Sequence, residues 1–183
     1  MNIFVLDENP VTSAEYMCDK HVIKMTLESA QLLSNCHSYY NSNYNLYKPT
    51  HMNHPCSLWV RESKSNYKWL YQHFIALANE YNLRYHKIHK SYLLLYNKLI
   101  DIPNGMLDIG LTPFKQCMPD IYKHNNPVTA YRSYYVGDKI KFAEWSYPSQ
   151  VPDWINIYGR CVYANIIKEN WIEEYFQQGV VIV

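Results

Sequence analysis

The sequence predicts a predominantly α-helical protein, with one domain over residues 1–183 and a short extended segment at its N-terminus. Hydrophobic residues recur at helical spacing in several long stretches, and strand-like alternation is scarce. Of the 183 residues, 48% are hydrophobic and 18% are charged, which is enough to bury a proper core. This composition excludes a disordered or fibrous protein. No repeat, low-complexity segment or interior linker divides the chain.

The first elements follow from local patterns near the N-terminus. Residues 2–6 are apolar and predict a short strand or an extended segment. After Pro10, the three-residue separation of Thr12 and Glu15 is typical of a capping box. A first helix is therefore expected over residues 13–36, followed by a polar, Tyr-rich loop at 41–53.

The remaining elements are also helical. Residues 55–85 carry apolar side chains at helical spacing after a proline, and a third helical pattern covers 86–100. A proline-containing stretch over 103–126 is expected to be irregular. Pro127 can occupy the first turn of a helix that extends to Trp145, and a last helical segment is expected over 163–176.

One edge of the first predicted helix concentrates polar side chains. They are Lys20, His21, Lys24, Glu28 and Gln31. At about 100° per residue, these five lie within a stripe about 100° wide. The other faces carry mainly apolar residues, namely Val22, Ile23, Met25, Leu27, Ala30 and Leu33. A mostly buried helix with such an edge is typical of the wall of a site; the alternative is a solvated edge stabilised by pairs such as Lys24–Glu28.

Glu28 is the candidate catalytic carboxylate. It follows His21 by seven residues, so the two side chains lie roughly 10 Å apart along the helix axis. They could hold opposite ends of a nucleotide-sized substrate. Glu28 could activate water or an amine, or stabilise positive charge on a sugar ring. His21 and Lys24 could bind a phosphate.

Further polar and aromatic residues are candidates for substrate binding. They are Lys20, Gln31, Asn53, His54, Arg61, Tyr67, Arg132, Tyr135 and Lys139. Arg132 stands among tyrosines, an arrangement that suits stacking beside a phosphate contact. Seven residues separate Arg132 from Lys139, which would place both near one helix face. For most of the aromatic residues, the alternative is packing in the core.

Cysteine usage and motifs predict neither a metal nor a cofactor. Five cysteines are scattered along the chain, which favours reduced thiols over a disulfide framework. The sequence His51-x-x-His54-x-Cys56 contains metal-ligating residue types, but no second half with zinc-finger spacing follows. Neither a P-loop nor a Gly-rich dinucleotide turn is present.

The charge distribution indicates a polyanionic partner. Residues 44–98 contain eight Lys or Arg residues against two Glu, together with many aromatic residues. This pattern favours DNA or a nucleotide, although the same lysines could simply solubilise long helices. No signal peptide and no membrane-spanning apolar run is found, so we expect the protein to act inside a cell, in the host cytoplasm if it is viral, without a membrane partner. The oligomeric state stays open.

Two separated segments resemble one family of enzymes. Asp19-Lys20-His21-Val22, followed by Glu28, resembles the first helix of the phage pyrimidine-dimer DNA glycosylases of the endonuclease V type. In that family a Gln-His pair is followed, seven residues after the His, by the catalytic glutamate. Residues 152–164 are similar to the aromatic segment that closes those enzymes, and His54-Pro55 before a long helix is similar to bacterial relatives.

The resemblance implies an all-α DNA-repair enzyme that flips a nucleotide, cleaves an N-glycosidic bond and can then nick the strand as an abasic-site lyase. Extrusion is needed because the bond is inaccessible inside the base stack. In that family, removal of Met1 exposes the α-amine that attacks the sugar C1′ and forms an imine, while the glutamate assists. The resemblance thus makes Glu28, His21 and the N-terminal amine the expected catalytic groups.

Several positions depart from the family pattern. Asn2 is too large for efficient removal of Met1, so the available amine would be that of Met1 itself. The longer stretch before His21 would carry this amine away from Glu28. Leu27 and Gln31 stand where the family has arginines. These departures favour activated water as the nucleophile, with the Met1 amine as the alternative.

Two other functions remain compatible with the sequence. One is a non-catalytic protein that binds a nucleotide or nucleic acid, for example a phage sponge for a host signalling nucleotide. The other is a base-modifying enzyme of a viral DNA pathway.

Overall fold

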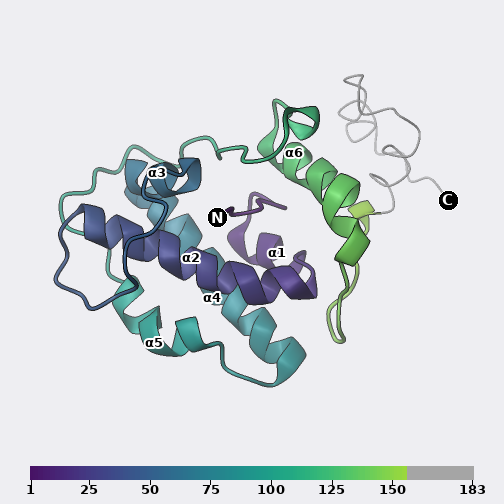
Figure 1. Cartoon of the computed structure of the whole chain (residues 1–183), viewed down its shortest axis with the longest axis horizontal. Helices are drawn as coiled ribbons and strands as arrows, with labels where there is room; N and C mark the ends of the chain where they lie inside the picture. The colour runs from purple at the N-terminus through teal and green to yellow at the C-terminus, as the bar shows by residue number, and fades with distance from the viewer. Residues whose placement is uncertain (156–183) are drawn as a thin grey trace.

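Helices supply the regular structure of residues 1–155, the part of the chain that the computed structural model describes (Figure 1). The α-helices in this range are α1 (Pro10–Glu15), α2 (Asp19–Tyr39), α3 (Pro55–Glu62), α4 (Lys64–Tyr85), α5 (Lys90–Leu99) and α6 (Pro127–Tyr134). No strand occurs among these residues, so the all-α prediction is confirmed. None of these helices is both long enough and apolar enough to cross a membrane.

The two longest helices, α2 and α4, pack against each other and form the centre of the fold. Helices α3 and α5 contact both of them, while α1 packs on α4. Small side chains on α2, such as Thr26 and Ser34, are buried in this packing. Their hydroxyls donate to the carbonyls of Val22 and Ala30 at 2.6 and 2.7 Å, so these polar groups are satisfied inside the core.

The N-terminal segment enters the core as extended chain, without a partner strand. Ile3, Phe4, Val5 and Leu6 are all at most 6% exposed. The Ser13 hydroxyl accepts from the Leu6 N–H at 3.0 Å and donates to the Phe4 carbonyl at 3.4 Å. A side chain therefore replaces a neighbouring strand in satisfying this backbone. In the view of Figure 1, the N-terminus accordingly appears near the middle, beside α2.

The first predicted helix is in fact two helices. α1 ends at Glu15 and α2 begins at Asp19, and the break between them buries Met17 and Cys18 completely. The predicted capping box of Thr12 and Glu15 is wrong. Asn9 caps α1 instead, because its side chain accepts from the N–H groups of residues 11 and 12.

The second predicted helix, 55–85, is also divided. Ser63 has an extended backbone with φ −152°, and its hydroxyl accepts from the Ser65 N–H to cap α4. The third predicted helix, 86–100, begins only at Lys90. His86 ends α4 in the left-handed backbone conformation, and the His89 side chain caps α5.

The helix predicted over 127–145 is α-helical only in its first part. α6 ends at Tyr134, a π-helical turn, η2, covers Tyr135–Lys139, and a 3₁₀ turn, η3, covers Ile140–Phe142. The expected irregular stretch before Pro127 is confirmed, apart from one short 3₁₀ turn, η1, at Asp120–Tyr122. The segment predicted over 163–176 lies outside the described residues.

The solvent-exposed face of α2 is wider than the sequence predicted, and it includes two apolar residues. Ile23 and Leu27, expected on buried faces, are 43% and 38% exposed. They lie next to Lys20 and Lys24, which are also exposed. The N-terminal segment and the neighbouring helices therefore leave this outer face of α2 open to solvent.

Candidate active site

A cavity of about 600 Å³ opens beside the first turns of α2. This volume lies within the range of small-molecule sites in proteins. The cavity is lined by seven of the residues that the sequence singled out, namely Met1, Lys20, His21, Lys24, Glu28, His54 and Lys139. The structure thus brings residues from the N-terminus, α2, the start of α3 and the π-helical turn to one place.

Glu28 lies on the wall of this cavity, with its side chain only 12% exposed. Its Oε2 atom accepts a hydrogen bond from the Asn2 backbone N–H at 3.0 Å and lies 4.0 Å from the Met1 amine nitrogen. Lys24, one turn earlier on α2, places its Nζ 3.6 Å from Oε1. The carboxylate is therefore held between two cationic groups.

The expectation that a longer N-terminal stretch separates the amine from Glu28 is wrong. The additional residues fold into α1 and the break before α2, and α1 packs on α4. The chain consequently doubles back, and its first residues lie against the side of α2 that carries Glu28.

Asn2 anchors the N-terminus through its side chain, a role that sequence reasoning missed. Its Oδ1 accepts from the Ile3 N–H at 2.8 Å and from the Tyr131 hydroxyl at 2.7 Å. Its Nδ2 donates to the Cys117 carbonyl at 2.8 Å. Tyr131 is fully buried, so this network fixes the first residues to the core. Cys117 and Tyr131 lie 115 and 129 residues from Asn2 along the chain, so no local spacing pattern predicts the network.

His21 is a neutral side chain in this setting. Burial, with smaller contributions from Lys139 and Lys24, lowers the pKa of His21 to about 3. Its Nδ1 lies 2.8 Å from the hydroxyl of Tyr135, which is fully buried. His21 therefore cannot bind a phosphate as a cation at neutral pH. Tyr135 fixes the imidazole from inside the core and does not line the cavity.

Three lysines supply positive charge around the cavity. Lys20 lies over the Phe142 ring at 5.2 Å, and Lys139 lies over the Tyr134 ring at 4.5 Å. Lys139 also pairs with Asp138 at 2.8 Å, whereas Lys24 keeps 67% of its side chain exposed. Cationic groups beside aromatic rings suit contact with the phosphates and bases of an extruded nucleotide.

Arg132 does not reach the cavity, contrary to the prediction. Its Nε donates to the Leu6 carbonyl at 2.8 Å, and its guanidinium pairs with Asp7 at 3.2 Å. The seven-residue spacing to Lys139 assumed a continuous α-helix. The π-helical turn at Tyr135–Lys139 changes the angle between the two side chains, so that only Lys139 lines the cavity.

The other predicted binding residues also lie away from the cavity. Tyr67 is 1% exposed and bonds to His37 Nε2 and the Leu99 carbonyl, both at 2.8 Å, so it belongs to the core. The Arg61 guanidinium lies 4.3 Å from the ring centroid of Tyr39, at the other end of α2. Gln31 and Asn53 do not line the cavity either.

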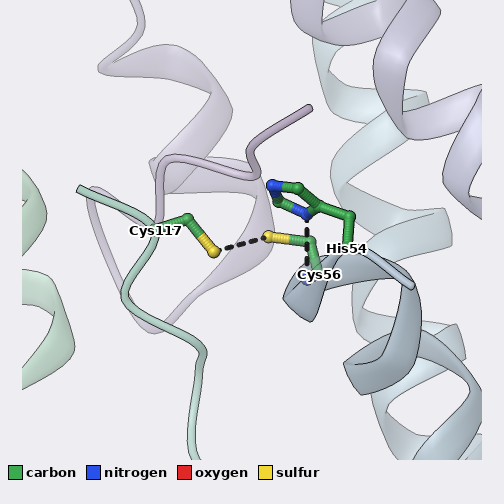
Figure 2. Close-up of side chains that lie close together, drawn as sticks. All are labelled: His54, Cys56 and Cys117. Carbon is green, nitrogen blue, oxygen red and sulfur yellow. Dashed lines mark hydrogen bonds between the residues drawn. The ribbon is translucent and has the colours of Figure 1, made fainter. Parts of the chain in front are cut away.

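A cluster of one imidazole and two thiols borders the cavity (Figure 2). The Cys56 and Cys117 sulfurs are 3.6 Å apart, and His54 Nδ1 accepts from the Cys56 N–H at 3.2 Å. A hydrogen bond from the Cys56 thiol lowers the pKa of Cys117 to about 7, and the N-terminal amine contributes to this lowering. The hydrogen bond to Cys117, together with burial, raises the pKa of Cys56. Sequence reasoning noted His54 and Cys56 as metal-ligating residue types, but it missed Cys117, which lies 61 residues from Cys56.

A family model described as pyrimidine dimer DNA glycosylase matches residues 1–93, half of the chain. The chain belongs to this family. The match contains α1 to α4, and with them Met1, Glu28 and His54. It confirms the family resemblance and supports a DNA glycosylase type of function, with DNA as partner. No curated protein and no solved structure matches the chain.

The second segment that resembles these glycosylases, residues 152–164, lies outside the range of the family match. Within it, Trp154 and Ile155 are buried, and the Trp154 ring lies 5.2 Å from the Arg132 guanidinium. Residues 156–164 of this segment lie outside the described part of the chain.

Proposed function

We propose that this protein is a DNA N-glycosylase that cleaves the base–sugar bond of a damaged pyrimidine, with an N-terminal amine as nucleophile and Glu28 as the assisting carboxylate. The observation that carries the proposal is the 4.0 Å separation of the Met1 amine nitrogen from Glu28 Oε2 at the cavity wall. This proximity favours the amine over the activated water that the sequence had favoured.

The chemistry needs a deprotonated amine and a group that tolerates positive charge. Glu28 can take a proton from the ammonium, which frees the nitrogen lone pair for attack on the sugar C1′. The C1′–N bond to the base then breaks, and the base leaves with that electron pair and gains a proton. Glu28 can supply that proton, and the carboxylate regenerated in this way stabilises the positive charge that develops on the sugar ring. The C1′–O4′ bond then breaks while a proton passes from the nitrogen to O4′, which leaves a protonated imine between the N-terminal nitrogen and C1′ of the opened sugar.

A strand break can follow from the same intermediate. Loss of a proton from C2′ of the imine expels the 3′ phosphate by β-elimination, and water then hydrolyses the imine to release the amine. Because Glu28 is the one carboxylate among the described residues that line the cavity, it is the candidate base for this proton as well. We therefore propose abasic-site lyase activity as part of the same reaction.

The rest of the cavity suits a nucleotide taken out of the duplex. Lys20, Lys24 and Lys139 would contact phosphates, while Phe4 and Phe142 offer apolar surface to the extruded sugar or base. Neutral His21 would support this wall and donate at most one hydrogen bond. Positively charged side chains thus surround Glu28, the carboxylate on which the proposed chemistry depends.

Borohydride trapping tests the nucleophile. The protein is mixed with duplex DNA that carries one thymine dimer or one abasic site, and sodium borohydride reduces any imine to a stable adduct. We expect a covalent protein–DNA species, and mass spectrometry of the linked peptide should locate it on the α-amine of Met1. If Met1 is removed, the adduct should fall on Asn2, whose nitrogen lies 3.0 Å from Glu28 Oε2.

Three results would argue against the proposal. Base release without any trapped adduct would assign the attack to water. An adduct on a lysine side chain would place the nucleophile elsewhere. DNA or nucleotide binding with neither base release nor adduct would favour the non-catalytic binding protein.

A further inference from the structure

We propose that His54, Cys56 and Cys117 bind a thiophilic divalent cation, Zn²⁺, at the edge of the cavity. The ligand atoms of these three residues all lie within 4.8 Å of one another. Figure 2 shows the three side chains turned toward a common point between α3 and the chain segment that carries Cys117. The site does not depend on the function proposed above.

The separation of the sulfurs fits a tetrahedral ion. With Zn–S bonds of about 2.3 Å, two sulfurs on one tetrahedral ion lie about 3.8 Å apart. The observed separation is 3.6 Å. A disulfide would instead need the sulfurs at about 2.05 Å, a much larger movement. The third ligand atom, a ring nitrogen of His54, lies within 4.8 Å of both sulfurs.

The chemical types of the ligands select the metal. Two thiolates and an imidazole suit Zn²⁺, whereas Mg²⁺ and Ca²⁺ require oxygen ligands. Within residues 1–155, the cluster contains no carboxylate. Three protein ligands leave one tetrahedral position, and because His54 and Cys117 line the cavity, that position would be open to it.

The site would add a link between two parts of the chain that already meet through the Glu62–Lys115 ion pair at 3.1 Å. His54 and Cys56 belong to the first turn of α3, whereas Cys117 lies in the irregular stretch before α6. The Cys117 carbonyl accepts from the Asn2 side chain, and its N–H donates to the Tyr131 hydroxyl at 3.3 Å. A metal bound here would brace the network that anchors the N-terminus, without taking part in bond cleavage.

Cobalt binding tests the site directly. The full-length protein is reduced, stripped of metal with a chelator and titrated with Co²⁺ under argon. We expect a sulfur-to-cobalt charge-transfer absorption band that saturates at one ion per chain and disappears when Zn²⁺ is added. Thermal unfolding should shift to higher temperature with Zn²⁺, because the ion binds the folded chain.

Variants identify the ligands. Cys117→Ser and Cys56→Ser should each remove most of the band. His54→Asn should lower the metal affinity by at least about tenfold. Removing only the hydrogen-bond partner of a metal ligand already costs about that much affinity, and here the ligand itself is removed. Asn can still cap α3 in place of His54, so this variant keeps the fold intact if a cysteine variant does not fold. Cys36→Ala is the matched control, because Cys36 is buried against Met106, outside the cluster, and should leave the band unchanged.

Two outcomes would overturn the proposal. One is a reduced protein that gives no charge-transfer band and no stabilisation by Zn²⁺, whether or not Cys56 and Cys117 form a disulfide when the protein is later oxidised. The other is a band that survives in Cys117→Ser, since the ion would then be held by different residues.

Discussion

The backbone N–H of Asn2 donates a hydrogen bond to Glu28 Oε2 at 3.0 Å, across 26 residues of sequence. This bond fixes the start of the chain relative to α2 and sets the distance between the N-terminal amine and the carboxylate. It exists because the buried segment that follows Asn2 occupies the core while the first residue remains at the cavity. The predictions below depend on this geometry.

Glu28→Gln should abolish base release while leaving DNA binding largely unchanged. The amide cannot take the proton from the amine, and general acid–base contributions are about 10²- to 10⁴-fold in rate. The measurement is single-turnover release of the damaged base, beside a binding titration with the same duplex. Glu62→Gln is the matched control, because Glu62 pairs with Lys115 and does not line the cavity. A Glu28→Gln variant with ordinary turnover would contradict the assignment.

Tyr131→Phe should slow adduct formation as well as destabilise the fold. The variant removes a buried hydroxyl that contacts Asn2 Oδ1 and the Lys115 carbonyl, both at 2.7 Å, at a cost of about 1–3 kcal/mol. Urea unfolding reports the stability, and borohydride trapping reports the position of the amine. Tyr67→Phe removes another buried hydroxyl, away from the N-terminus, so it should lose similar stability but keep its trapping rate. Equal trapping rates in the two variants would show that Tyr131 does not position the amine.

Lys24→Gln and Lys139→Gln should each weaken DNA binding and reduce the salt dependence of the affinity by about one released counterion. Both lysines line the cavity, where a phosphate of the extruded nucleotide would lie. Binding titrations at several salt concentrations give the slope. Arg132→Gln offers the contrast, because its guanidinium is already bonded to the Leu6 carbonyl and Asp7. We expect Arg132→Gln to lose stability and to keep the same slope of affinity against salt concentration. A reduced slope would show that Arg132 contacts a DNA phosphate.

His21 should make the folded protein sensitive to mild acid. Its pKa falls from 6.5 to about 3 on folding, so between these values the unfolded chain holds a proton that the folded chain lacks. Stability contributed by neutral His21 is therefore complete above pH 6.5 and is lost as the pH falls toward 3. His21→Gln should lower the number of protons taken up on unfolding near pH 5 by about one, measured from the slope of unfolding free energy against pH. The unsubstituted protein, measured over the same pH range, is the reference, and an equal slope in His21→Gln would contradict the prediction.

Helical periodicity predicted most of the fold, and its errors have physical reasons. Met17 and Cys18 continue an apolar pattern, but they are buried by the break between α1 and α2 instead of by one continuous helix. Ser63 looks like an ordinary polar position within a helix, yet its hydroxyl caps α4 and divides α3 from it. In both places a local side-chain hydrogen bond or tertiary burial decided where the helix ended.

The candidate site was predictable where it is local in sequence. Lys20, Lys24 and Glu28 share one helix edge, and helical geometry alone brings them together. Asn2 and Cys117 could not be found in this way, because their partners come from distant parts of the chain. Family resemblance supplied the importance of the N-terminal amine, but only the folded chain showed how near that amine lies to the carboxylate.

The buried start of the chain has a practical consequence for making the protein. The Met1 side chain is 4% exposed, and Met1 itself forms part of the cavity wall. Residues fused ahead of it, such as an affinity tag or the remnant of a cleavage site, would have to pass through this cavity and would turn the amine of the proposed mechanism into an amide. Purification tags therefore belong at the C-terminus, and an inactive preparation that carries an N-terminal tag would not test the proposed function.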